Sequence, residues 1–289
     1  MTECTGDYVK WIYDWFGDCV VETRDYWSFA ICLFPTIIWI YAIAPQIFLN
    51  FKNHSAEAVS LLYYFFSVSG DISNCVGLFL NHGLITQKFC IFWAIFADGT
   101  VFSQYVYYHW VRPYFTGEKY VDPGESNDGY EPIAGNGAGL AVLPLLGKTA
   151  AATASILSKN PILKNDNPYS KENLPGTLLG WYSGITFAGG RIPQIVKNFK
   201  RKRTTGLSLT YWTSSFFANS FYGISVLLKD NSWNYIWKQA PWLLGSWGCL
   251  PFDLTVLIQF AYYRRKKKNT ESTLLTTTEA SNEQIDTTF

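Results

Sequence analysis

Long runs of apolar residues alternate with short polar stretches along most of this chain. A helix needs about 20 mostly apolar residues to cross the hydrocarbon core of a bilayer. Six runs reach this length and predict helices near residues 27–50, 60–81, 89–111, 176–197, 208–228 and 240–263. A seventh run, 137–157, is weaker because it is rich in Ala and Gly and holds Lys148, but neighbouring helices can screen such a segment. The pattern predicts an all-α polytopic membrane protein with seven transmembrane helices and the lipid bilayer as its surroundings.

The composition agrees with a bilayer as the main solvent. Apolar residues make up 48% of the chain and charged residues 16%, and residues 27–112 contain only six charged side chains. A water-soluble fold cannot cover its surface with so few charges. The net charge of +1 provides no field that would attract nucleic acid, so we expect no nucleic-acid partner. Residues 1–25 are charged throughout and lack the apolar run of a signal peptide.

The cysteines and histidines give no sign of a metal site. Six cysteines and three histidines occur without a CxxC pair or a Cys/His cluster. Cys32, Cys75 and Cys249 lie in apolar runs, where they are expected to be buried packing residues. We therefore expect neither a metal nor a cofactor.

The distribution of Lys and Arg predicts the orientation. In a seven-helix arrangement whose N-terminus faces away from the cytosol, loops on the cytosolic side carry thirteen Lys and Arg and the others carry eight. We therefore expect a non-cytosolic N-terminal segment and a cytosolic C-terminal tail, disordered from Asn269 because it is rich in Thr, Ser and Glu. The expected segments are 1–26 (non-cytosolic), 112–136 (flexible, cytosolic), 158–175 (lumenal) and 264–289 (cytosolic tail).

An internal repeat gives the architecture. The segment 45–67 (PQIFLNFKNHSAEAVSLLYYFFS) aligns without a gap on 193–215 (PQIVKNFKRKRTTGLSLTYWTSS), with ten of 23 positions identical at an offset of 148. Both copies run from the end of one apolar span into the start of the next, in the same orientation. Two parallel three-helix repeats, 27–111 and 176–263, joined by a linker helix at 137–157, satisfy this pattern as a 3+1+3 fold. Such repeats place a transport path at their interface.

The paired Pro-Gln dipeptides resemble those of the PQ-loop membrane proteins, relatives of the SWEET sugar carriers. PWLLGSWGCLPFDLTVLIQFAYYRRKK, WIYDWFGDC, SGDISNCVG and NSFYGISVLLK are similar to segments of the lysosomal and vacuolar cationic amino acid transporters of that family. The resemblance covers both repeats and the N-terminal segment. It implies a lysosomal or vacuolar membrane and export of Lys, Arg and His from the lumen by alternating access.

Four ionisable residues stand out inside the expected spans. Each costs about 2.5–3.5 kcal/mol to insert and therefore indicates function. They are Asp71, Asp98, Asp253 and Arg191. The structural alternative is a buried ion pair between Arg191 and one of the aspartates, which leaves two carboxylates. These would favour a cationic substrate such as lysine or arginine, and a carboxylate deprived of solvent could also load a proton.

Neutral polar residues complete a site that both repeats share. Asp71 and Asn219 are repeat mates at offset 148, and so are Asn74 and Tyr222. The two second helices thus present polar side chains at matching heights, as expected of a substrate-binding site at the midplane. Interhelical hydrogen bonding is the structural alternative.

The Pro-Gln pairs are the candidate hinges. Pro45 and Pro193 remove a backbone N–H and kink a helix, which predicts gating motion or, as the alternative, a static kink. Gln46 and Gln194 are expected to bond the freed backbone or to line the path.

Other functions fit less well. LLGKT at 145–149 ends like a phosphate-binding loop but has Val142 where that motif requires glycine, so we expect no enzyme of that kind. Hydrolysis by paired Asp71 and Asp98 has no further support. A seven-span receptor or nutrient sensor that recruits a cytosolic regulatory complex is the main alternative, although a receptor needs no duplicated hinge. Carriers of cystine or of a sugar are further alternatives.

Two features outside the spans carry hypotheses. Cys4 and Cys19 flank YVKWIYDWF on the non-cytosolic side, where an oxidising lumen permits a disulfide. In the tail, Leu274 and Leu275 follow Glu271 and approximate an acidic dileucine sorting signal, with a shorter spacing than usual.

Overall fold

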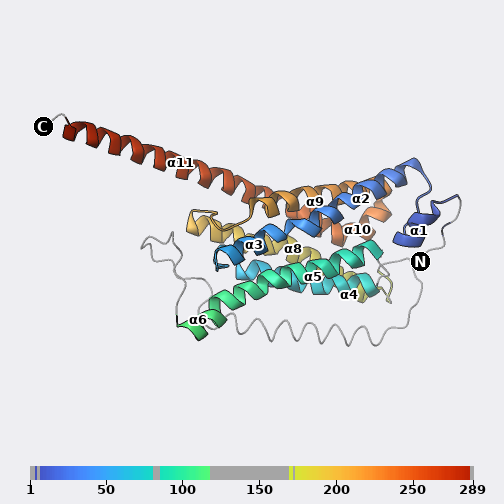
Figure 1. Cartoon of the computed structure of the whole chain (residues 1–289). Coiled ribbons are helices and arrows are strands. Elements are labelled where there is room, and N and C mark those ends of the chain that lie inside the picture. The colour runs from blue at the N-terminus through green and yellow to red at the C-terminus, as the bar shows by residue number, and fades with distance from the viewer. Residues whose placement is uncertain (1–3, 5–6, 81–84, 118–168, 172, 287–289) are drawn as a thin grey trace.

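The computed structural model describes residues 4, 7–80, 85–117, 169–171 and 173–286, and within these ranges it contains helices and no strand. The helices are α1 (Lys10–Phe16), α2 (Thr23–Ala42), α3 (Ala44–Lys52), α4 (Leu61–Leu80), α5 (Ile85–Val106), α6 (Arg112–Thr116), α8 (Leu174–Arg201), α9 (Leu209–Lys229), α10 (Trp233–Ser246) and α11 (Leu250–Asp286) (Figure 1). A π-helical turn, Tyr107–Val111, follows α5, and a 3₁₀ turn, Trp247–Cys249, joins α10 to α11. The expected linker helix at 137–157 lies outside the described residues.

Two of the expected spans are broken in the structure. The span at 27–50 is divided between α2 and α3 at Ile43, and Pro45 lies in the first turn of α3, where its missing N–H is tolerated. The span at 240–263 is divided between α10 and α11 at the 3₁₀ turn. By contrast, α8 continues through Pro193 without a break.

The C-terminal segment differs from expectation. Disorder was expected from Asn269, but α11 continues to Asp286 and extends away from the bundle (Figure 1). No proline or glycine follows Pro251, so the sequence contains nothing that ends the helix. The side chains of Leu274 and Leu275 are not among those described.

The bundle is apolar outside and buries many polar groups beside its apolar core. Large apolar side chains such as Phe48, Phe96, Ile185 and Ile258 are 60–66% exposed, while Asn198 and Asp253 are fully buried. This arrangement suits a lipid environment, where polar groups must find partners inside the protein. Two segments, Thr23–Lys52 and Trp233–Lys267, are long and apolar enough to cross a membrane by length and composition. The other long helices α4 and α8 bury several polar residues, among them Asp71 and Arg191.

The repeats exchange helix contacts. α2 packs along α9, and α4 packs along α8, so the first helix of each repeat lies against the second helix of the other (Figure 1). α10 also packs against α8. The interface between the repeats therefore runs through the centre of the bundle.

The glutamine of the first Pro-Gln pair bonds to the second repeat. Gln46 Nε2 donates to the carbonyl oxygen of Gly206 at 3.1 Å, and its Oε1 accepts from the backbone N–H of Ser208 at 2.7 Å. Asn50 Oδ1 accepts a further bond from Gln46 Nε2 at 2.8 Å. All polar atoms of this amide are thus used to hold the loop that precedes α9.

The second glutamine makes the equivalent bonds in the opposite direction. Gln194 Nε2 donates to the carbonyl oxygen of Ala58 at 3.1 Å and to Asn198 Oδ1 at 2.9 Å. Its Oε1 accepts from the backbone N–H of Ser60 at 2.6 Å. We call these two sets of bonds the glutamine clamps; each ties one repeat to the loop of the other.

The third helices extend the clamps and show a second offset. Asn50 donates to Gln104 at 3.0 Å, and Asn198 donates to Gln259 at 2.8 Å. The two glutamines of the third helices in turn donate to the backbone of α3 and α8. They are 155 residues apart, so the third helices correspond at an offset of 155 and not 148.

A hydrogen bond between Glu57 and His109 also holds the loop between α3 and α4. Glu57 Oε1 lies 2.7 Å from His109 Nδ1 in the π-helical turn. Burial raises the pKa of Glu57, but the hydrogen bond from His109 and the nearby charge of Lys197 outweigh burial and hold the pKa below its ordinary value. The loop therefore keeps an ionised carboxylate.

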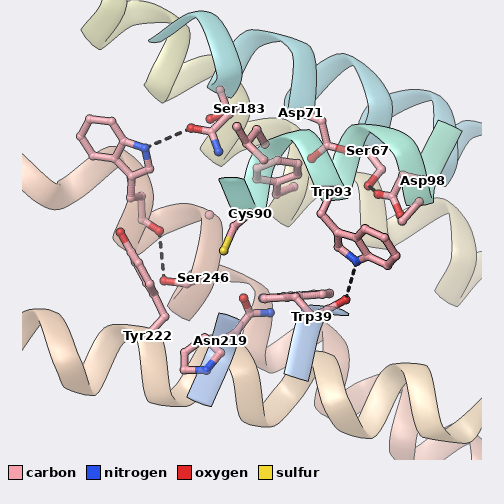
Figure 2. A pocket seen from close by; sticks show the side chains of 18 of the residues that line it. Trp39, Ser67, Asp71, Cys90, Trp93, Asp98, Ser183, Asn219, Tyr222 and Ser246 are labelled. Carbon is pink, nitrogen blue, oxygen red and sulfur yellow. Dashed lines mark hydrogen bonds between the residues drawn. The ribbon is translucent and has the colours of Figure 1, made fainter. Parts of the chain in front are cut away.

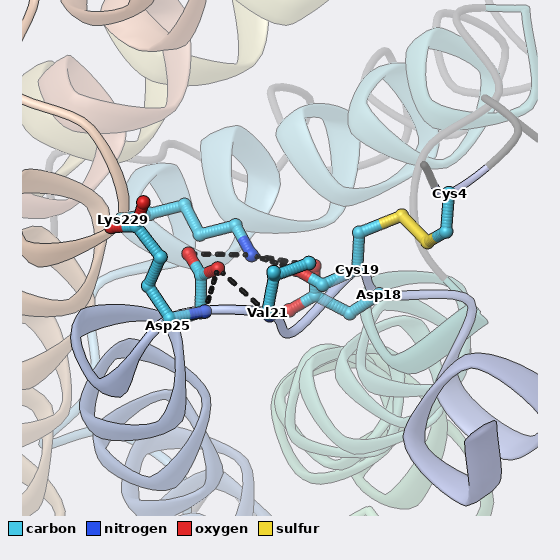
Figure 3. The surroundings of a disulfide bond; sticks show 7 residues. Cys4, Asp18, Cys19, Val21, Asp25 and Lys229 are labelled. Atoms are coloured by element: carbon cyan, nitrogen blue, oxygen red, sulfur yellow. Dashed lines mark hydrogen bonds and ion pairs between the residues drawn. A yellow bond between two sulfur atoms is a disulfide. The ribbon is translucent and has the colours of Figure 1, made fainter. Parts of the chain in front are cut away.

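The N-terminal segment is tied to the end of α9. Cys4 and Cys19 form a disulfide with their Cα atoms 5.8 Å apart. Lys229 lies 3.2 Å from Asp18 and 3.3 Å from Asp25 (Figure 3). These contacts fasten the segment over one end of the bundle.

Close packing of α8 against α10 predicts a strong effect at Gly184. A Cβ added there would lie 2.4 Å from the carbonyl oxygen of Pro241, a backbone atom that cannot move aside. Gly184→Ala should lower the thermal midpoint of the purified protein by several degrees, since overpacking costs about 1–3 kcal/mol. Gly189→Ala on the same helix meets nothing within 4 Å and should leave the midpoint unchanged or raise it. Equal midpoints for the two variants would contradict the packing.

The disulfide predicts a difference between cysteines. Alkylation of the denatured protein without reductant should modify Cys32, Cys75, Cys90 and Cys249, which are free, and spare Cys4 and Cys19. Mass analysis before and after reduction reads the difference. Modification of all six cysteines without reductant would show that the bond does not form.

Candidate functional site

A cavity of about 240 Å³ lies between the two repeats. Five of the expected substrate-binding residues line it: Asp71, Asn74, Asp98, Asn219 and Tyr222. They reach it from α4, α5 and α9, and Figure 2 shows the two aspartates on the opposite side of the cavity from Asn219 and Tyr222. The repeat-mate pattern thus brings these side chains into one place.

Two carboxylates face this cavity, one buried (Asp71) and one half-buried (Asp98). Asp71 is only 3% exposed, and its Oδ2 atom has no hydrogen-bond partner among the described residues. Asp98 accepts a hydrogen bond from Ser67. A buried carboxylate without a compensating charge is costly, so the site has a strong demand for a cation or a proton.

The single basic side chain among the described residues that line the cavity is already paired. Arg191 is 5% exposed, and its Nε lies 2.5 Å from Asp253 Oδ1. Its guanidinium also donates to Ser215 Oγ at 3.1 Å. The positive charge of Arg191 is therefore neutralised by Asp253.

Asp253 lies elsewhere than the other expected substrate-binding residues. It is fully buried and does not line the cavity. Besides Arg191, it accepts hydrogen bonds from Ser215 at 2.9 Å and from Asn219 at 3.2 Å. Arg191 selects this aspartate because α8, α9 and α11 bring the three donors around it, which the sequence alone left open among three aspartates.

Aromatic side chains shape the rest of the cavity. Trp242 Nε1 donates to Asn74 Oδ1 at 3.1 Å, and Trp93 Nε1 donates to the carbonyl oxygen of Trp39 at 3.1 Å (Figure 2). The hydroxyls of Tyr63 and Tyr211 bond to each other across the repeats. These groups fix the polar side chains in place and leave the walls largely apolar.

Several site residues were missed at the level of the sequence. Tyr63 with Tyr211 and Ser67 with Ser215 are identical repeat mates at offset 148, so the alignment contained a signal for both pairs. The equivalence of Asp98 and Asp253 was hidden because the third helices follow the offset of 155.

The expected hinge residues lie outside the cavity. Pro45, Gln46, Pro193 and Gln194 are absent from the described residues that line it. The two glutamines form the clamps at the loops, and the two prolines sit one residue before them. The sequence predicted that these glutamines bond the backbone freed by the prolines or line the path, whereas in the structure they bond the loop backbone of the opposite repeat.

Among the described residues, no group of three or more His, Cys, Asp or Glu side chains is placed to hold a metal ion. The cavity therefore offers carboxylates, amides and phenols. Such groups bind an organic cation through charge and hydrogen bonds.

Comparison with known proteins identifies relatives of the whole chain. A lysosomal amino acid transporter 1 homolog of Homo sapiens is 27% identical over 272 residues, which cover 91% of this chain and 91% of the relative. The vacuolar histidine transporter YPQ3 of Saccharomyces cerevisiae is 30% identical over 283 residues, covering 82% of this chain and 90% of the relative. Both are named as transporters and not as enzymes.

A solved structure of a eukaryotic SWEET transporter has a similar fold. It superposes with a TM-score of 0.53 at 12% identity, covering 84% of this chain and 100% of that chain. This likeness confirms the fold class, an all-α polytopic membrane protein. The PQ loop repeat model matches residues 27–87 and 175–235, which contain the two Pro-Gln pairs and the two clamps. The chain therefore belongs to the family of PQ-loop repeat membrane proteins.

Proposed function

We propose that the protein exports cationic amino acids (lysine, arginine and histidine) from the lumen of a lysosome or vacuole to the cytosol. The cavity between the repeats is the substrate site, and the repeats alternate its access between the two sides. The N-terminal segment with its disulfide faces the lumen, and the basic clusters at 197–203 and 264–268 face the cytosol.

The observation that carries this proposal is the pair of carboxylates, the buried Asp71 and the half-buried Asp98, at a cavity whose arginine is already neutralised. Two unit charges 4 Å apart interact by about 4 kcal/mol at an effective dielectric constant near 20. Desolvation of the incoming cation offsets part of this gain. A neutral solute such as a sugar gains none of this electrostatic attraction, so the site favours a cation over a neutral solute.

The relatives support the same class of substrate. One is named an amino acid transporter and the other a histidine transporter, and both are named for acidic organelles. The cavity walls offer apolar area for an aliphatic or aromatic side chain, and Asn74 and Asn219 offer amides to the backbone groups of an amino acid.

Alternating access is supported by the exchanged contacts between the repeats. The Tyr63–Tyr211 bond and the two glutamine clamps lie between the repeats on the side of the loops. Opening the cavity toward these loops requires breaking these bonds, and closing it again restores them. The number of bonds is small and their geometry is duplicated, as a reversible gate requires.

Asp71→Asn tests the charge of the site. The substitution is nearly isosteric and copies the repeat mate Asn219, but it removes one of the two carboxylates of the cavity. Uptake of labelled arginine into proteoliposomes should fall at least tenfold, because a charged partner is replaced by a neutral amide.

Asp14→Asn is the matched control for this change. Asp14 is exposed on α1, outside the cavity, so its loss should leave uptake unaltered. Arginine uptake by the Asp71 variant at the rate of the unmodified protein, with equal amounts in the membrane, would exclude this residue from the site. Uptake of glucose or cystine in preference to lysine, arginine and histidine by the unmodified protein would overturn the proposed substrate class.

Pro193→Leu tests the hinge. Pro193 interrupts the hydrogen bonding of an otherwise continuous α8 one residue before the second clamp. Leucine restores a backbone donor and should stiffen the helix, so turnover should fall by about an order of magnitude while the arginine concentration that gives half-maximal uptake changes little. Unchanged turnover at normal expression would reduce the proline to a static kink.

A further inference from the structure

Equivalent carboxylates of the two repeats have different surroundings. Asp98 and Asp253 occupy corresponding positions in the third helices, at the offset of 155. Each accepts a hydrogen bond from a serine, Ser67 and Ser215 respectively, and these serines correspond at the offset of 148. The same Ser–Asp pair therefore occurs twice in the bundle.

In the second repeat this pair is neutralised from within the chain. The Arg191 guanidinium bonds to Asp253 at 2.5 Å and to Ser215 at 3.1 Å. Asn219 completes the group, because its Nδ2 lies 3.2 Å from Asp253 and 3.3 Å from Ser215. One positive and one negative charge thus share a site with a serine and an amide.

In the first repeat the positive charge is missing. The position that corresponds to Arg191 is Ile43, and the position that corresponds to Asn219 is Asp71. Ile43, Ser67, Asp71 and Asp98 all line the cavity, whereas Ser215 and Asp253 do not. The cavity therefore reaches the position in the first repeat that corresponds to the position of the Arg191 guanidinium in the second repeat.

We propose that the cationic side chain of the substrate binds in the first repeat beside Asp98, Ser67 and Asp71. This position corresponds to the one that the Arg191 guanidinium holds in the second repeat. The inference rests on the proposed function and adds the subsite and its orientation. Ile43 is the residue that determines specificity, because its apolar side chain leaves this position free of an internal cation.

The chemistry of the subsite matches the two ends of its expected ligands. A guanidinium carries five N–H donors in a plane and an ammonium carries three, enough to reach a carboxylate and a hydroxyl together. Asp71 Oδ2, which has no partner among the described residues, becomes an acceptor for one of these donors. Asn74, held by Trp242, lies one helical turn further along α4 and is left for the backbone groups of the amino acid.

Ile43→Arg tests the subsite by supplying the missing cation from the chain. The new guanidinium would copy Arg191, pair with Asp98 and exclude the substrate. Ile43→Met serves as the matched control, because it introduces a long side chain without charge. Arginine and lysine uptake by the Ile43→Arg protein should be at least tenfold below that of the Ile43→Met protein. Equal uptake by the two variants would overturn the proposal.

Asp98→Asn tests the same subsite through selectivity. Citrulline has the shape of arginine but an uncharged ureido group in place of the guanidinium. The unmodified protein should prefer arginine over citrulline at least tenfold in competition for uptake, and the Asp98→Asn protein should lose most of that preference. A preference that survives in Asp98→Asn would show that the cationic end binds elsewhere.

Binding separates this inference from the proposed function. Arginine should raise the thermal midpoint of the unmodified protein in detergent more than citrulline does, and it should not raise that of Ile43→Arg. If the unmodified protein shows this shift without transporting arginine, the proposed function fails and the subsite stands. If arginine and citrulline shift the midpoint equally, the subsite is wrong even where transport occurs.

Discussion

A carboxylate inside a membrane-spanning bundle has to be matched by a positive charge or a proton. Water is absent from the lipid phase, and leaving an ion unpaired in a protein interior costs several kcal/mol. Among the residues that the structure describes, the buried Asp71 and Asp253 and the half-buried Asp98 lie inside the bundle, and Arg191 neutralises Asp253. Asp71 and Asp98 stay in the cavity wall, where a mobile cation can reach them. The net negative charge of the cavity wall follows from this imbalance.

The glutamine clamps explain how two similar halves enclose such a cavity. Each repeat uses its Pro-Gln pair to hold the loop of the other, and the first helix of each packs on the second helix of the other. Neither repeat can satisfy these polar groups alone, because the acceptors and donors lie on its partner. The interface is therefore polar at one end, where the clamps lie, and hollow in the middle, where the aspartates lie.

Much of the fold follows from the sequence because its patterns are local. Apolar runs located the helices, and the gapless repeat showed that two halves correspond. Pro45 accompanies a break between α2 and α3 while Pro193 lies inside a continuous α8, so a proline alone did not predict which span divides. α11 continues beyond Asn269 because no proline or glycine there ends the helix. The repeat also brought Asp71, Asn74, Asn219 and Tyr222 into one site. Which aspartate pairs with Arg191 could not be read from the sequence, since spacing along separate helices does not fix which side chains meet across them.

The difference between the repeats is as important as their likeness. If position 43 held arginine as position 191 does, both Ser–Asp pairs would be neutralised. Asp71 would then be the one cavity aspartate left without a cation. If both positions held isoleucine, three carboxylates, two of them buried, would be left without a cation. The bundle would then take up protons or lose stability. With one arginine and one isoleucine, the Ser–Asp pair of the second repeat is neutralised and that of the first repeat keeps its negative charge. The second repeat thus contains a guanidinium bound to its Ser–Asp pair as a permanent part of its structure. The equivalent Ser–Asp pair of the first repeat has isoleucine at the position of that arginine.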